Sequence, residues 1–173
     1  MFSAVVGLGN PGPRYRHTRH NIGCTVVQAL AEHESVTAWK SKFHGSWATV
    51  SRPPMQLRLL VPANFMNKAG ESVRPFAEFF SLSPADILIV HDDLELPFGE
   101  VALREGGGLG GHNGLRSVAQ HLGTRDFPRL RIGIGRPARG DVASYVLARF
   151  TPQEEAELVD VVETAVATIL RST

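Results

Sequence analysis

The chain has 173 residues, of which 43% are hydrophobic and 20% are charged, and its formal net charge at pH 7 is +1. This composition is that of a globular domain with enough apolar side chains to bury a core, and it excludes a disordered or fibrous chain. No apolar run approaches the roughly 20 residues that a membrane-spanning helix needs. The N-terminus also lacks the basic and apolar regions of a secretion signal. We therefore expect one domain over residues 1–173, located in the cytoplasm and without a membrane partner.

The basic residues are concentrated in two segments. Residues 1–52 hold six Lys/Arg against two Asp/Glu, and residues 101–150 hold eight against three. If the two segments meet in the fold, they form a positive surface suited to a polyanion such as RNA. A solvated charged face without a partner is the alternative. The single cysteine, Cys24, lies on the apolar spacing of a predicted helix, which favours a packed core thiol over a reactive one.

The first half of the chain alternates between strand and helix patterns. An apolar run over residues 1–6 predicts a buried strand, which stops at a loop rich in glycine and proline. Apolar spacing of helical period then predicts a helix over residues 22–34. Short strands are expected at residues 43–50 and 56–61, with the turn between them at Pro53 and Pro54.

The middle of the chain contains the strand that we expect at the centre of the sheet. A helix is predicted over residues 68–80, with Asn67 placed to cap it. Residues 86–91 are almost continuously apolar, which is typical of a strand buried on both faces. This strand ends on His91, Asp92 and Asp93, so it directs acidic groups out of its carboxyl end.

The last part of the chain continues the alternation. We expect strands at residues 101–104 and 130–134, a helical face from Leu115 to Leu122, and a short element at residues 142–146. Thr151, Pro152 and Glu154 form a helix-start signal for a final helix. The predicted fold class is therefore α/β, with helices on both faces of one twisted, mostly parallel or mixed sheet.

Polar and titratable side chains follow the carboxyl ends of the predicted strands, where open α/β sheets place their sites. Asn10 and His20 follow the first strand, and Asp92 ends the central one. A histidine beside a carboxylate is held in one tautomer and can act as a general base near neutral pH. A histidine that only braces its loop is the alternative for His20.

Other candidate sites fit the sequence less well. Residues 7–12 satisfy G-x-G-x-x-G, but Pro11 and Pro13 remove amide donors and no acid ends the next strand, which counts against a dinucleotide site. The glycine-rich segment at residues 106–114 lacks the Lys-Ser/Thr of a nucleoside triphosphate site. The remaining histidines have no convincing ligand spacing, so we expect no metal and no cofactor. A simple helix cap is the alternative for Asn113.

Five motifs resemble those of the bacterial peptidyl-tRNA hydrolase family. They are G-L-G-N-P-G-x-x-Y-x-x-T-R-H-N at 7–21, F-M-N-K-x-G at 65–70, H-D-D-L-x-L-P-x-G at 91–99, G-G-G-x-G-G-H-N-G-L at 106–115 and R-L-R-I-G-I-G-R-P at 129–137. The resemblance spans the whole chain. It implies a cytoplasmic, monomeric, metal-independent enzyme that hydrolyses the ester between an N-blocked peptide and the 3′ end of tRNA, and so recycles tRNA from stalled peptidyl-tRNA.

The resemblance also implies roles for individual residues. His20 would be the base and Asp92 the carboxylate that supports it, while three side-chain amides would hold the peptide and the water: Asn10, Asn67 and Asn113. We expect the carbonyl of Asn10 to accept from the peptide N–H and so to recognise a blocked substrate. The remaining substrate-binding residues would be Tyr15 and Phe65 at the tRNA 3′ end and site wall, Met66 beside them, and Arg104 and Arg131 as a clamp for the tRNA 5′ phosphate.

Two alternatives from other functional classes stay open at this point. A catalytically silent RNA-binding protein could use the same scaffold, although it would have no need of five polar site residues. A nucleotide-dependent oxidoreductase would show tight binding of a nicotinamide or flavin cofactor. The sequence alone does not indicate a preference among tRNAs or peptides.

Overall fold

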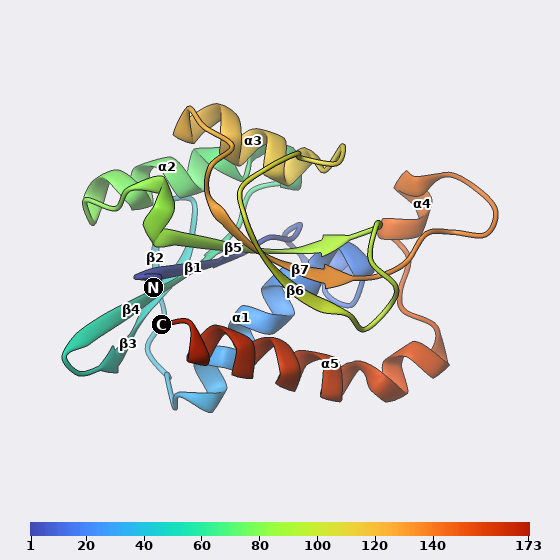
Figure 1. The fold of residues 1–173 in the computed structure, drawn as a ribbon, viewed down its shortest axis with the longest axis horizontal. Helices are drawn as coiled ribbons and strands as arrows, with labels where there is room; N and C mark the ends of the chain where they lie inside the picture. The colour runs from blue at the N-terminus through green and yellow to red at the C-terminus, as the bar shows by residue number, and fades with distance from the viewer.

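Seven strands form one sheet in the computed structural model, which describes residues 1–173 (Figure 1). The strand order is β2-β3-β4-β1-β5-β7-β6. The strands are β1 (Ala4–Gly7), β2 (Lys40–Lys42), β3 (Gly45–Arg52), β4 (Met55–Pro62), β5 (Ile87–Asp93), β6 (Val101–Glu105) and β7 (Pro128–Gly133). The four central strands β4, β1, β5 and β7 run parallel to one another, while β3 and β6 pair antiparallel with their neighbours. The predicted α/β class with a mixed sheet is therefore confirmed.

Helices cover both faces of the sheet. They are α1 (Ile22–His33), α2 (Gly70–Phe79), α3 (Asn113–Leu122), α4 (Val142–Val146) and α5 (Pro152–Arg171), and short 3-10 turns stand at η1 (Pro13–Tyr15), η2 (Arg19–Asn21), η3 (Met66–Lys68) and η4 (Pro84–Asp86). Figure 1 shows α2 and α3 on one face and α1 and α5 on the other, with the two chain ends close together. None of these helices combines the length and the apolar character that crossing a membrane would require.

Two hydrophobic cores lie on opposite faces of the sheet because successive strand residues point to opposite sides. Val5 and Leu88 pack toward α1 and α5, whereas Val6 and Ile89 pack toward α2 and α3. Burying one such side chain stabilises the fold by about 1.5–3 kcal/mol. Cys24 lies on the buried face of α1, where burial raises the pKa of its thiol to about 12. The expectation of a packed core thiol is confirmed.

The structure corrects several element boundaries and two capping assignments. The first strand begins at Ala4 rather than Met1, and α2 begins at Gly70 because η3 occupies the preceding residues. Asn67 lies inside η3 and does not cap α2. Asn113 is the first residue of α3, and the capping side chain is that of His112.

The edge strand β2 was not predicted. All of its residues are exposed, so it carries no apolar alternation that could signal a strand. It is fixed by antiparallel pairing with β3, in which Lys40 lies opposite Trp47.

Candidate active site

A pocket of about 1010 Å³ opens where the parallel strands end. It is lined by all but one of the residues singled out from the sequence: Asn10, His20, Phe65, Met66, Asn67, Asp92, Arg104, Asn113 and Arg131. The exception, Tyr15, packs edge-on against Phe65 with 6.4 Å between ring centroids. Because Phe65 is 55% exposed, this aromatic pair stands at the rim of the pocket.

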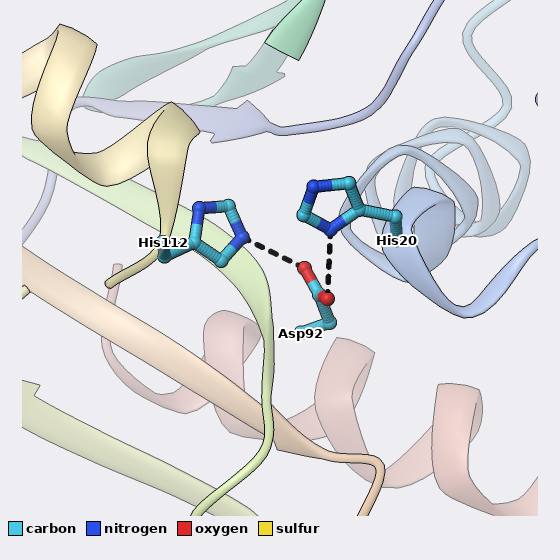
Figure 2. Close-up of side chains that lie close together, drawn as sticks. All are labelled: His20, Asp92 and His112. Atoms are coloured by element: carbon cyan, nitrogen blue, oxygen red, sulfur yellow. Dashed lines mark hydrogen bonds and ion pairs between the residues drawn. The ribbon is translucent and has the colours of Figure 1, made fainter. Parts of the chain in front are cut away.

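His20 and Asp92 meet in the pocket although they are far apart in sequence. His20 Nδ1 lies 2.8 Å from Asp92 Oδ2, and Figure 2 shows the carboxylate between two imidazole rings. The carboxylate can only accept, so the proton of a neutral His20 is on Nδ1 and the lone pair is on Nε2. The expected pairing of histidine and carboxylate is therefore present.

Asp92 is almost fully buried, with 3% of its surface exposed. Burial opposes its ionisation, but the charges and hydrogen bonds of His112 and His20 outweigh burial and hold the pKa of Asp92 well below its ordinary value. The carboxylate therefore stays ionised throughout the neutral range, where it can stabilise a positive charge that develops on either ring.

The second ring in Figure 2 belongs to His112, a site residue that the sequence reasoning missed. His112 Nε2 donates to Asp92 Oδ1 over 2.8 Å, while its Nδ1 accepts from the backbone N–H groups of Gly114 at 3.1 Å and Leu115 at 3.2 Å. One side chain thus caps α3 and orients the Asp92 carboxylate. The sequence signal for this role was the position of His112, just before the predicted helical face that starts at Leu115, where a helix-capping side chain is expected.

Asn10 is held in place by hydrogen bonds to its neighbours. Asn21 forms two hydrogen bonds of 2.9 Å with the backbone of Asn10. The side-chain carbonyl of Asn10 accepts from the backbone N–H of Met66 over 2.8 Å. The carbonyl expected to accept from the peptide N–H therefore already accepts one hydrogen bond, whereas the Nδ2 amide group of Asn10 has no partner within the chain.

Asn67 and Asn113 present free amides to the pocket. Asn67 lies in η3 and Asn113 at the start of α3, and both line the cavity. The hydrogen bonds within the chain do not engage either side-chain amide, so both remain available as donors and acceptors.

One side of the pocket is formed by arginines from β6 and β7. Arg104 is exposed on β6, and Arg131 on β7 donates its Nε to Asp93 Oδ2 over 2.7 Å. Arg129 lies opposite Arg104 in the antiparallel register and is 1% exposed. Arg104 and Arg131 give the pocket a cationic side suited to a phosphate group.

Comparison with known proteins identifies the relatives of this chain. The family model described as peptidyl-tRNA hydrolase matches residues 4–172. The chain is 47% identical over 162 residues to the peptidyl-tRNA hydrolase of Geobacter sp. (strain M21), with 94% of this chain and 86% of the relative covered. The chain belongs to the peptidyl-tRNA hydrolase family.

Two further members of the peptidyl-tRNA hydrolase family support the assignment. The protein from Sorangium cellulosum is 46% identical over 169 residues, which cover 96% of this chain and 76% of the relative. The crystal structure of the peptidyl-tRNA hydrolase from Acinetobacter baumannii superimposes with a TM-score of 0.89 at 40% identity, covering 96% of this chain and 85% of the other. Both sequence and fold therefore match the family along nearly the whole chain.

Family membership argues against the dinucleotide alternative, and the packing explains the glycines that suggested it. A Cβ at Gly7 would overlap the backbone of Gly23, and one at Gly9 would overlap the Cys24 sulfur. These glycines let α1 pack closely on the loop after β1. The first two glycines of the G-x-G-x-x-G pattern thus serve helix packing in this member of the peptidyl-tRNA hydrolase family, whereas Gly12 has open space around it and a positive φ of 96°.

The hydrogen bonds around Asp92 do not favour a metal ion. Ligand atoms of His20, Asp92 and His112 lie within 4.8 Å of one another. To bind a metal through Nε2, a neutral His112 would have to carry its proton on Nδ1, which faces the N–H groups of Gly114 and Leu115. Those two donors oppose that tautomer. The residues therefore fit a hydrogen-bonded chain better than a metal site.

Proposed function

We propose that this chain hydrolyses the ester bond between an N-blocked peptide and the 3′ end of tRNA, releasing both. Membership of the peptidyl-tRNA hydrolase family supports the substrate class. The observation that carries the reaction type is the 2.8 Å contact between His20 Nδ1 and Asp92 Oδ2, which leaves Nε2 as the basic atom in the pocket. No serine or cysteine lines the pocket, so water is the nucleophile that the site can activate.

The proposed reaction begins with a water molecule hydrogen-bonded to His20 Nε2. As the water oxygen attacks the ester carbonyl carbon, its proton passes to Nε2, and Asp92 stabilises the imidazolium. The tetrahedral intermediate then collapses, the bond from carbon to the ribose oxygen breaks, and the proton on Nε2 passes to that oxygen. The products are a peptide with a free carboxyl group and a tRNA with a free 3′-terminal hydroxyl.

The side-chain amides supply hydrogen-bond donors for this reaction. Asn67 and Asn113 are free of partners within the chain, and Asn10 has a free Nδ2, so each can donate to a carbonyl or to the developing oxyanion. General-base assistance contributes about 10²–10⁴ in rate. Each well-placed oxyanion donor contributes on the order of 10²–10³. Neutral amides also avoid forming an ion pair with Asp92.

The tRNA part of the substrate would bind outside the reacting centre. The exposed Phe65 and its partner Tyr15 offer aromatic faces on which unpaired bases of the 3′ end can stack. Arg104 and Arg131 lie on the cationic side of the same pocket and would bind the 5′ phosphate, Arg131 through the Nη groups that its ion pair with Asp93 leaves free.

A release assay tests this proposal directly. The intact protein should release peptide from a peptidyl-tRNA prepared with an N-acetylated aminoacyl group, without added metal or cofactor. The His20→Ala variant should bind tRNA as the parent does but should release almost no peptide. If the parent binds tRNA but leaves the ester intact, the chain is an RNA-binding member of its family rather than an enzyme.

A further inference from the structure

Arg129 is a buried cation without an acidic partner. Its side chain reaches the loop that joins β6 to α3, and only 1% of the residue is exposed. The guanidinium donates to three backbone carbonyls, those of Gly107, Gly108 and Arg125. None of the ion pairs in the structure includes it. Burial and the neighbouring cations Arg104, Arg125 and Arg131 lower its pKa, although Asp126 acts in the opposite direction.

A buried cation surrounded by like charges is costly, so its position needs a compensating role. Two of the three carbonyls that it holds, those of Gly107 and Gly108, belong to a segment with several glycines at positive φ: 78° at Gly106, 106° at Gly107, 58° at Gly110 and 76° at Gly111. Such backbone has many accessible conformations in the absence of restraint. The hydrogen bonds from Arg129 supply a restraint at the start of this loop.

The same loop is in contact with Arg104. A Cβ atom built on Gly107 would lie closer than 3.0 Å to three guanidinium atoms of Arg104. Gly107 therefore contacts Arg104 with its Cα side and accepts from Arg129 with its carbonyl, so the loop lies between the two guanidinium groups. The antiparallel register places Arg104 and Arg129 on directly opposed residues of β6 and β7. The loop backbone fills the space that would otherwise bring the two cations together.

We propose that Arg129 is a positioning residue that anchors the loop at residues 106–108 and thereby seats Arg104 for binding a phosphate group of the tRNA. This inference rests on the proposed function, because it concerns how that substrate is held. Arg129 acts in this proposal through the loop, because its terminal nitrogens donate to backbone carbonyls and only 1% of the residue is exposed at the pocket.

The contacts that hold His112 lie outside residues 106–108. His112 is held by the N–H groups of Gly114 and Leu115 in α3, and its own backbone N–H donates to Leu109 at 3.0 Å. Loss of the Arg129 hydrogen bonds should therefore disturb residues 106–108 without moving His112 from Asp92. The proposal predicts a change in KM for tRNA-bearing substrates with kcat retained.

The first experiment compares Arg129→Met with Arg125→Met. Arg125 is an exposed neighbour whose side chain makes no hydrogen bond in the structure, so its replacement removes an equal charge from the same region while keeping the carbonyl that Arg129 uses. Arg129→Met should raise KM for peptidyl-tRNA about tenfold. It should also reduce the slope of log KM against log salt concentration by roughly the contribution of one neutralised phosphate. Arg125→Met should stay near the parent. Equal effects of the two variants would show that net charge, not positioning, is responsible.

The second experiment perturbs the contact between Gly107 and Arg104 and leaves Arg129 unchanged. Gly107→Ala places a methyl group against the Arg104 guanidinium and should raise KM in the same way. Gly123→Ala is its matched control, because Gly123 also has a positive φ, of 74°, but has open space around the added methyl. Gly107→Ala should add little to the KM of Arg104→Ala, since both act on one contact. If the effects of Gly107→Ala and Arg104→Ala on log KM add fully in the double variant, the proposal is overturned.

A short substrate separates this inference from the proposed function. An N-acetyl-aminoacyl ester of adenosine lacks the phosphates of the tRNA, so Arg129→Met and Gly107→Ala should cleave it with the kinetic constants of the parent. If Arg104→Ala leaves the KM for peptidyl-tRNA unchanged, the phosphate clamp itself is wrong. If Arg104→Ala raises this KM but Arg129→Met and Gly107→Ala do not, the clamp stands and the positioning role is rejected. An equal loss of activity on both substrates in the folded variants also rejects it.

Discussion

His112 and Asp92 are joined by a 2.8 Å hydrogen bond from Nε2 to Oδ1, the carboxylate oxygen that His20 leaves free. The carboxylate is therefore oriented from two sides, by a loop before α1 and by the N-terminus of α3. A base that depends on this carboxylate should in turn depend on His112.

Replacement of His112 by alanine should lower kcat about tenfold or more, because a hydrogen bond to a charged group is worth about 1.5–3 kcal/mol. It should also destabilise the fold by about 1 kcal/mol, since α3 loses its cap. His112→Asn is the control: asparagine is a good helix cap but is too short to reach Asp92. Measured stability should recover in His112→Asn while kcat stays low, and recovery of both would remove His112 from the orientation of Asp92.

The arrangement of Asn10 predicts how a blocked substrate is recognised. An N-blocked substrate has an additional carbonyl that a free aminoacyl-tRNA lacks, and the free Nδ2 of Asn10 can donate to it. Asn10→Asp keeps the acceptor for the Met66 N–H but removes this donor. The ratio of kcat/KM for blocked over free substrate should fall at least several-fold in Asn10→Asp. An unaltered ratio would contradict this role.

Arg104 and Arg131 are predicted to act in binding and not in chemistry. Replacement of either by alanine should raise KM and reduce the salt dependence of binding, by roughly 0.7–0.9 in slope for each phosphate that the variant no longer neutralises. Arg131→Ala should also change the pocket in a second way, because Asp93 then loses its ion-pair partner. The rise in KM in this variant therefore reports on phosphate binding less selectively than the rise in Arg104→Ala. Titration of KM against salt concentration for both variants provides the measurement, and unchanged slopes would show that neither residue binds phosphate.

Most residues of the candidate site could be predicted from the sequence. His112 and Arg129, whose contacts join elements that lie far apart in the sequence, could not. His20, Asp92 and the three asparagines follow strand ends, where periodicity and motif both indicate a site. His112 was missed because its cap and its contact with Asp92 are visible only once α3 and β5 are placed together. Arg129 was missed because alternation along β7 does not reveal which loop covers it. The strand order is likewise set by long-range pairing, which no local pattern encodes.

Acid should destabilise the fold partly through His91. Burial, with the charge of His112 adding to it, lowers the pKa of His91 from 6.5 to about 4. Between these two pH values the unfolded chain binds a proton that the folded chain does not, so stability should fall as the pH drops from about 6.5 to 4. The contribution is fully present above pH 6.5. Denaturant unfolding of the parent and of His91→Gln at pH 7 and pH 5 measures it: the parent should lose more stability than the variant, and equal losses would contradict the assignment.

The central claim is that His20 is the base and that Asp92 supports it, and the pH profile of kcat/KM tests both parts. Activity of the parent should fall on the acidic side, because a protonated His20 cannot accept the proton of water. In Asp92→Asn the charge is lost while the shape is kept, so the plateau should drop and the acidic limb should move to lower pH, because the imidazolium is no longer stabilised. His20→Ala should lose nearly all turnover while still binding tRNA. Substantial turnover in His20→Ala, or an acidic limb that does not move in Asp92→Asn, would contradict the account.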